Sequence, residues 1–248
     1  MLRAGLALLF ALSAASVAQA QFPDKFTNLK VLPKDISKRE LQATMRGFAF
    51  ALGVRCGHCH VEKPAAASGY DFPADDKDAK KTARLMLRMV EAINRDYIAK
   101  VENTGNKATI RVECMTCHRG LTQPQPLHHL LAASLDKDGL EKTVALYHEL
   151  RVKYYGTGQY DFGETPLNQL SEQLLAKNKN REAVTVMELN FKANHPDSVW
   201  AYHILAMAHQ ANGQLKEAIT DYKNALVQHP DDTWAKSQVD ELSKKLGN

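Results

Sequence analysis

The chain has 248 residues, of which 44% are hydrophobic and 24% are charged, a composition typical of a soluble globular protein with one large domain or two small ones. Its 32 basic and 28 acidic residues leave a formal net charge of only +4. A balance this mild gives no reason to expect a nucleic-acid partner, and it excludes a DNA-type basic patch as the basis of function.

Residues 1–20 are predicted to be a secretory signal peptide. Arg3 supplies the positive start, and an apolar run follows from Leu6 to Val17. The A-x-A pattern that ends at Ala20 predicts cleavage there, with Gln21 as the mature N-terminus. An uncleaved membrane anchor is the alternative, although the run is short for a bilayer span. We therefore expect a periplasmic protein.

A first helix is predicted after an irregular lead-in over residues 21–34. Ser37 and Glu40 form the S-x-x-E capping box that marks a helix start. Apolar side chains then recur with helical spacing on one face, and Gly53 suits the C-cap. The residues on this face are Leu41, Met45, Phe48 and Leu52.

A loop rich in Ala, Pro and Asp is expected from Pro64 to Asp78, and a second helix from about Asp78 to Tyr97. The apolar face of this helix carries several large side chains with helical spacing. These are Leu85, Met86, Met89, Val90 and Ile93.

All four cysteines lie in two copies of the pattern Cys-x-x-Cys-His, which is the attachment signature of a covalent c-type haem. Two thiols at this spacing can add to the two vinyl groups of one porphyrin, and the next histidine then lies under the ring, where it can bind iron. We predict two covalently bound haem c groups. They are attached through Cys56 and Cys59 and through Cys114 and Cys117, with His60 and His118 as the proximal iron ligands.

The sixth iron ligand decides between electron transfer and catalysis, because a methionine thioether closes the site and raises the reduction potential. Met45 lies on the inward face of the helix before the first motif and is the predicted ligand there. For the second haem, Met89 is favoured, with Met86 as the alternative. Each methionine can instead be a core side chain that fills space.

The character of the chain changes near Leu127, after which helices follow one another without cysteine. A period of about 35 residues relates the helix pairs, close to the 34 of tetratricopeptide repeats. Leu205, Gly213, Ala218, Tyr222 and Pro230 resemble the consensus of that repeat. A further helix is expected from Gly139 to Tyr155, and a polar closing helix from Thr233 to Leu246, as solenoids require. A generic helical bundle is the alternative.

The segment from Leu32 to Gly120 resembles the cytochrome c subunit of photosynthetic reaction centres and its non-photosynthetic relatives. The residues that carry the resemblance are Leu41 to Cys56 with Met45, the run from Thr82 to Met89, and Cys117-His118-Arg119-Gly120. In that family each haem lies along a helix whose methionine is the sixth ligand, which supports Met45 and Met89. The photosynthetic subunit looks like a four-haem protein, commonly lipid-anchored, whereas this chain has two motifs and a repeat tail. Photosynthesis is therefore not implied.

The sequence predicts a mostly α fold, with a signal peptide at 1–20, a small dihaem cytochrome c domain at 21–126 and an α-solenoid of tetratricopeptide-like helix pairs at 127–248. The expected function is single-electron transfer between redox partner proteins, a membrane-bound complex among them, with the tail docking a protein. We therefore expect an electron carrier and not an enzyme. The alternatives are a dihaem peroxidase-like enzyme with one open haem site, and an interaction protein in which the two cysteine pairs bind zinc.

Overall fold

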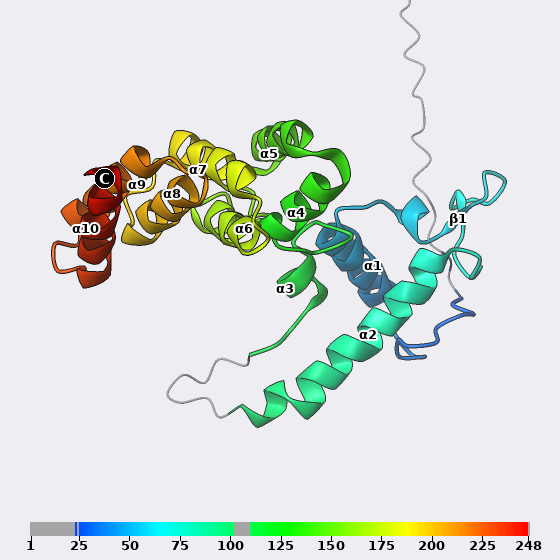
Figure 1. Ribbon diagram of the computed structural model, residues 1–248. Coiled ribbons are helices and arrows are strands. Elements are labelled where there is room, and N and C mark those ends of the chain that lie inside the picture. Colours follow the sequence, from blue (N-terminus) through cyan, green and yellow to red (C-terminus); the bar gives the residue numbers. More distant parts are fainter. Residues whose placement is uncertain (1–22, 24, 102–109, 248) are drawn as a thin grey trace, which may run out of the picture. The chain divides into compact units, whose positions relative to one another are not determined.

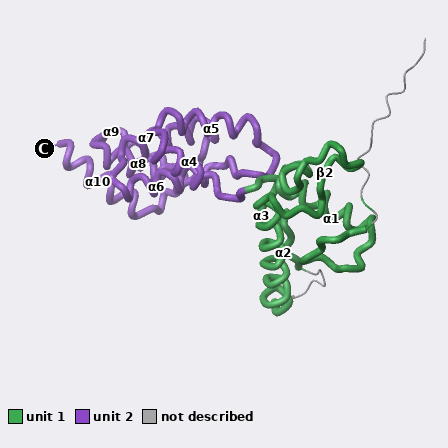
Figure 2. The backbone as a smooth tube through the Cα atoms, turned by 90° about the vertical axis from the view of Figure 1, so that its right-hand side faces the viewer, with its two compact units in different colours: residues 1–122 green, residues 123–248 purple. Residues whose placement is uncertain are grey.

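The computed structural model describes residues 23, 25–101 and 110–247, so the predicted signal peptide lies outside the described residues. The backbone divides into two compact units, 1–122 and 123–248, which are described separately (Figure 2). The boundary predicted from the sequence lies after Pro126. None of the described helices is long and apolar enough to cross a bilayer.

Unit 1 begins with helix α1, Lys38–Leu52, whose ends are set by local signals (Figure 1). The Ser37 hydroxyl accepts from the Glu40 amide, and the Glu40 carboxylate accepts from the Ser37 amide at 3.1 Å, which completes the predicted capping box. Gly53 ends the helix in the left-handed conformation, with φ 65°. Both predicted ends of this helix are confirmed.

After α1 come a short 3₁₀ turn η1 (Cys56–His58) and two two-residue strands, β1 (Val61–Glu62) and β2 (Tyr70–Asp71), which pair antiparallel. The loop predicted from Pro64 to Asp78 thus contains one strand of a small hairpin. Helix α2 (Asp78–Asp96) matches the predicted second helix, and η2 (Ile98–Lys100) follows it. The unit closes with α3 (Cys114–His118), a single helical turn that contains the second motif.

Unit 1 buries few apolar side chains of its own. Among its described residues only Leu41 and Ala51 are buried apolar side chains. Helix α2 has no buried residue, and Leu85 and Met89 on its predicted apolar face are 59% and 44% exposed. A hydrophobic core normally supplies most of the free energy of folding. Unit 1 therefore depends on polar contacts and on whatever covers these apolar side chains.

Unit 2 is a run of antiparallel helix pairs whose buried apolar side chains form three clusters. Its helices are α4 (Leu127–Asp138), α5 (Leu140–Tyr154), α6 (Thr165–Ala176), α7 (Asn180–Asn194), α8 (Val199–Ala211), α9 (Leu215–Gln228) and α10 (Thr233–Gly247). The helices α4, α6 and α8 lie along one side, and α5, α7 and α9 along the other, in both views (Figures 1 and 2). The helices predicted from Gly139 and from Thr233 are confirmed as α5 and α10.

Small buried residues let the helices of unit 2 approach closely. Alanines with no exposed surface lie at the crossings of α7, α8, α9 and α10: Ala183, Ala206, Ala218, Ala225 and Ala235. Large side chains such as Leu167, Ile204 and Tyr222 fill the space between pairs. The small side chains leave room for the large ones, as the close packing of protein interiors requires.

Candidate haem attachment sites

The first Cys-x-x-Cys-His motif is wound into one tight turn directly after α1. The amides of Cys59 and His60 both donate to the carbonyl oxygen of Cys56, at 3.2 and 3.0 Å. Cys56 is exposed and Cys59 is half-buried. Burial raises the pKa of the Cys59 thiol against the opposing charges of two nearby lysines. Both sulfurs and the histidine of the motif thus belong to a single turn, as attachment of one porphyrin requires.

The His60 ring is held by packing. Its ring meets that of Phe72 edge to face, with 4.9 Å between centroids. Nδ1 is buried and makes no hydrogen bond of ordinary geometry within the described residues, and the Phe72 backbone favours the protonated ring. Burial, followed by the charge of Lys80, lowers the pKa of His60. A neutral imidazole is the form that binds a metal.

Basic side chains tie the first motif to the start of α2. Lys77 Nζ donates to the carbonyl oxygen of Gly57, inside the motif. Lys80 Nζ donates to the carbonyl oxygens of Phe72 and Ala74, both at 2.7 Å. These contacts give the motif a fixed support that the sequence analysis did not predict.

Asp75 is the central carboxylate among these basic side chains. It forms ion pairs with Lys30 at 2.6 Å, with Arg84 at 2.8 Å and with Lys80 at 3.2 Å. Hydrogen bonds from Lys30 and Asn28 hold the pKa of the Asp75 carboxyl well below its usual range. The carboxylate therefore stays ionised and joins the lead-in, the hairpin and α2.

The second motif is the helix α3 itself. The Glu113 amide donates to the Thr116 hydroxyl at 3.0 Å as part of a capping box, and Arg119 ends the turn in the left-handed region with φ 47°. Burial raises the pKa of the Cys114 thiol. His118 Nδ1 lies 2.7 Å from the carbonyl oxygen of Leu121. Because a carbonyl only accepts, Nδ1 carries the proton, and Nε2 is left with the lone pair that an iron ligand needs.

Two long-range contacts position the second motif. Asn94 on α2 donates to the carbonyl oxygen of Val112 and accepts from the Val112 amide, both at 2.8 Å. After the motif, the Gly120 amide donates to the Ala51 carbonyl oxygen at 2.9 Å, directly before the first motif. The fold thus brings the segment after the second motif against the end of α1. Asn94 is not predicted as a functional residue, because a lone asparagine in a helix carries no local signal.

The methionines proposed as sixth ligands lie on the two long helices of unit 1. Met45 on α1 and Met86 on α2 are half-buried, and Met89 on α2 is 44% exposed. Met115, inside the second motif, is also 44% exposed. A half-buried His60 with a lowered pKa, an oriented His118 and uncovered apolar side chains on α2 fit a unit that holds haem. That methionine side chains bind the haem irons as sixth ligands stays a prediction.

The described residues contain no group of three or more His, Cys, Asp or Glu side chains that could hold a metal ion. A structural zinc site needs four such ligands in one place. The two cysteine pairs are therefore not gathered into one zinc site in this fold.

The family model for the photosynthetic reaction centre cytochrome C subunit matches residues 9–216. The chain belongs to this family. Membership implies covalently bound haem c. A curated relative, the photosynthetic reaction center cytochrome c subunit of Thermochromatium tepidum, is 32% identical over 116 residues. That match covers 46% of this cytochrome and 25% of the relative, so the chain spans about a quarter of the relative's length.

A tetratricopeptide repeat model matches residues 199–238 of the cytochrome, which include α8 and α9. The repeat predicted for unit 2 is thereby confirmed. Among solved structures, MamA from Desulfovibrio magneticus RS-1 is 16% identical, with 68% of this chain and 86% of that chain covered and a TM-score of 0.37. The Arabidopsis OM64 TPR domain is 22% identical, with 48% and 92% covered and a TM-score of 0.34. Scores of this size do not assign a function.

Proposed function

We propose that the protein is a periplasmic dihaem c-type cytochrome that transfers single electrons between redox partner proteins, with unit 2 as its docking module. Cys56 and Cys59 would hold one haem, with His60 as the proximal ligand. Cys114, Cys117 and His118 would hold the other. Met45 is the proposed sixth ligand of the first haem and Met89 that of the second, with Met86 as the alternative.

The observation that carries the proposal is the orientation and protonation of the two motif histidines. The Nδ1 atom of His118 lies at the Leu121 carbonyl oxygen, and the half-buried His60 ring packs on Phe72 with a lowered pKa, which favours the neutral imidazole. Each therefore has a ring nitrogen available as a ligand beside a pair of cysteines. When bound, the haem irons supply reversible one-electron exchange. The residues of unit 1 attach, orient and shield the two groups.

Haem content is the direct test. A denaturing gel of the purified protein should stain for haem, since only thioether-linked haem survives, and pyridine haemochrome spectra should give two haems per chain. The Cys56→Ala/Cys59→Ala variant should retain one haem. A colourless protein, or a variant with unchanged haem content, would refute the assignment.

Ligation distinguishes an electron carrier from a peroxidase-like enzyme. If Met45 binds iron, Met45→His should abolish the thioether charge-transfer band of the first haem and lower its midpoint potential, because imidazole stabilises ferric iron more than thioether does. A high-spin haem that binds added cyanide in the resting wild-type protein would instead favour the enzyme.

Maturation in the periplasm can be tested at the N-terminus. Edman degradation of protein purified from the periplasmic fraction should begin at Gln21 if the predicted signal peptide is cleaved after Ala20. A chain that starts at Met1 and sediments with membranes would contradict this part of the proposal.

The docking surface is proposed on the face of unit 2 that carries its exposed aromatic side chains. Trp200 and Met207 on α8 are 37% and 40% exposed, and Trp234 on α10 is 42% exposed. The His203 ring packs edge to face on Trp234, with 4.7 Å between centroids. Partly exposed tryptophans supported by neighbours are typical anchors of protein interfaces.

Reduction of the cytochrome by membranes isolated from the source organism tests this surface. The Trp200→Ala/Trp234→Ala variant should be reduced several-fold more slowly than wild type at low cytochrome concentration. The matched control is Val152→Ala/Val227→Ala, which removes side chains that are 90% and 75% exposed on α5 and α9. Equal rates for the tryptophan variant, the control and wild type would exclude docking by this face.

A further inference from the structure

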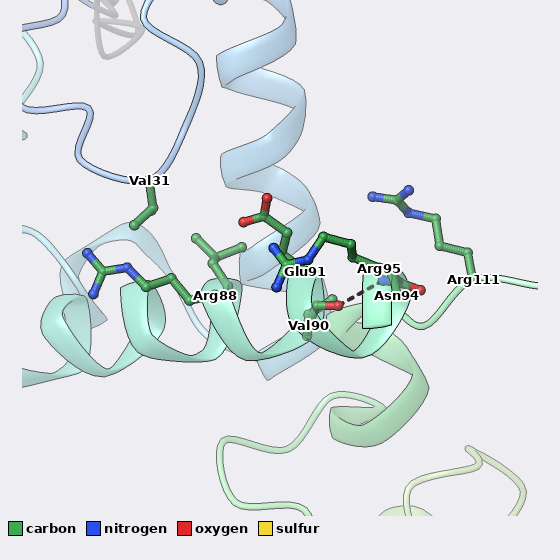
Figure 3. Close-up of a pocket in the computed structure, with 8 residues that line it drawn as sticks. Val31, Arg88, Val90, Glu91, Asn94, Arg95 and Arg111 are labelled. Carbon is green, nitrogen blue, oxygen red and sulfur yellow. Dashed lines mark hydrogen bonds between the residues drawn. The ribbon is translucent and has the colours of Figure 1, made fainter. Parts of the chain in front are cut away.

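Helix α2 borders a pocket of about 460 Å³ in unit 1 that the haem motifs do not themselves form. Figure 3 shows its side chains along one side of α2, with Val31 of the lead-in across from them. Three arginines line it, Arg88 and Arg95 from α2 and Arg111 from the segment before the second motif. We call it the arginine pocket. Its remaining wall includes Leu87 and Glu91.

The charges of the arginine pocket are only partly balanced. Arg95 is already engaged, because its guanidinium makes two hydrogen bonds of 2.8 Å to Asp96. Arg88 and Arg111 have no ion pair or hydrogen bond within the part of the chain that the structure describes. Glu91 is the one carboxylate in the lining. Arg88 and Arg111 lie toward opposite ends of the lining (Figure 3), so each guanidinium can hold a carboxylate of its own through the two hydrogen bonds of its planar fork.

The position of the pocket connects it to both motifs. Arg84, Arg88, Glu91 and Arg95 follow one another at helical spacing on one face of α2. Arg84 is close enough to His60 for its charge to lower the pKa of that ring. Since a helix rises about 1.5 Å per residue, Arg88 lies about 6 Å further along this face. On the other side, the hydrogen bonds between Asn94 and Val112 fix Arg111 just ahead of Cys114.

We propose that Arg88 and Arg111 each bind a propionate carboxylate of a covalently attached haem. The pocket combines apolar side chains, Val31 and Leu87, with free guanidiniums, and this matches a haem edge, which carries methyl groups and carboxylates together. An acidic side chain of a partner protein needs the guanidiniums but not the apolar wall. The inference rests on the proposed dihaem function and adds two residues that position the cofactor without ligating iron.

The test compares Arg88→Gln/Arg111→Gln with a control of equal charge change in unit 2, Arg181→Gln/Lys216→Gln. Both midpoint potentials are measured by optical redox titration, and haem content by pyridine haemochrome. With two haems still attached, at least one potential should fall in the pocket variant relative to the control, because loss of nearby positive charge stabilises ferric haem. Arg88→Lys/Arg111→Lys should restore most of the potential.

Resonance Raman spectra measure the propionate bending frequencies, which report hydrogen bonds to the carboxylate. A change of charge at a distance would leave these frequencies unchanged. A shifted bending band in the Arg→Gln variant is expected. Two attached haems with unchanged potentials and bands would overturn the inference and leave the proposed function intact, even if partner-dependent rates changed. Wild-type protein without haem would instead refute the proposed function. If the double variant does not mature, the single substitutions Arg88→Gln and Arg111→Gln carry the same test.

Discussion

A Cβ atom added to Gly53 would lie 2.2 Å from the backbone oxygen of Gly120. The two glycines therefore touch through their backbones, next to the hydrogen bond from the Gly120 amide to the Ala51 carbonyl. One of them ends the helix before the first motif, and the other follows the second motif. This contact joins the two haem attachment segments, and it leaves no room for a side chain at position 53.

Gly53→Ala should destabilise unit 1 strongly. The substitution places a side chain in the left-handed region, at φ 65°, and forces a backbone–backbone contact apart. Together these effects predict a loss of about 2–5 kcal/mol in the free energy of unfolding. Chemical denaturation followed at the haem Soret band, which reports unit 1, measures the loss.

Two other glycines of unit 1 serve as controls. Gly69 has φ +72° with nothing within 4 Å of its added Cβ, so Gly69→Ala isolates the conformational cost, about 1–2 kcal/mol. Gly47 lies inside α1 with open space around it, and Gly47→Ala should stabilise by about 0.5–1 kcal/mol. A Gly53→Ala loss no larger than that of Gly69→Ala would show that the contact with Gly120 is not made.

Asn94→Ala should loosen the segment that leads into the second motif. The substitution removes both hydrogen bonds to the Val112 backbone, and the expected cost is about 1–3 kcal/mol. Hydrogen–deuterium exchange in peptides that cover residues 110–117 should become faster, whereas exchange in α1 should change little.

Asn94→Asp is the matched variant, since its carboxylate still accepts from the Val112 amide but no longer donates to the carbonyl. Exchange should therefore be intermediate between wild type and Asn94→Ala. Asn180→Ala in unit 2 removes one exposed hydrogen bond, to Ala211, and is the control for loss of an asparagine. Identical exchange at 110–117 in all four proteins would refute the role of Asn94.

The local signals in the sequence account for α1, α2 and the helix pairs of unit 2, because caps, periodicity and repeat spacing act within a few turns. The hairpin at Val61–Glu62 and Tyr70–Asp71 has strands of two residues, too short to show any alternation. The contacts that position the candidate sites join residues far apart in the chain: Asn94 with Val112, Gly53 with Gly120, and Asp75 with Lys30. Such long-range pairs produce no periodic pattern in the sequence. The motif residues are therefore predictable from the sequence, whereas the residues that position them are not.

The methionine of α2 that binds the second haem can be identified by paired substitutions. Met89→Ala should abolish one thioether charge-transfer band and lower one midpoint potential, while Met86→Ala should leave both bands in place. Met89 is 44% exposed and Met86 is half-buried, so Met86→Ala should cost more stability if it only packs. The reverse spectroscopic result would assign the ligand to Met86, and retention of both bands in both variants would remove α2 as the source of the ligand.

Unit 2 should lose stability between about pH 10 and 12 through Tyr222. This side chain has no exposed surface, and its hydroxyl donates to the Gln210 side-chain oxygen at 3.1 Å. Burial raises the pKa of Tyr222 from 10.0 to about 12. Below pH 10 the phenol is neutral in both states and the stabilisation is fully present.

As the pH rises above 10, the unfolded chain ionises first, so stability falls until the folded state ionises near pH 12. A difference of this size corresponds to about 2–3 kcal/mol.

Urea denaturation of unit 2, followed by far-ultraviolet circular dichroism at pH 9, 10.5 and 11.5, measures this loss. Tyr222→Phe lacks the hydrogen bond to Gln210, so it should be less stable than wild type at pH 9. Because it also lacks the ionisable phenol, it should lose less stability as the pH rises. Tyr155→Phe removes a phenol from a side chain that is 64% exposed and should follow the wild-type curve. If Tyr222→Phe and wild type lose stability in parallel, ionisation of Tyr222 is not coupled to the folding of unit 2.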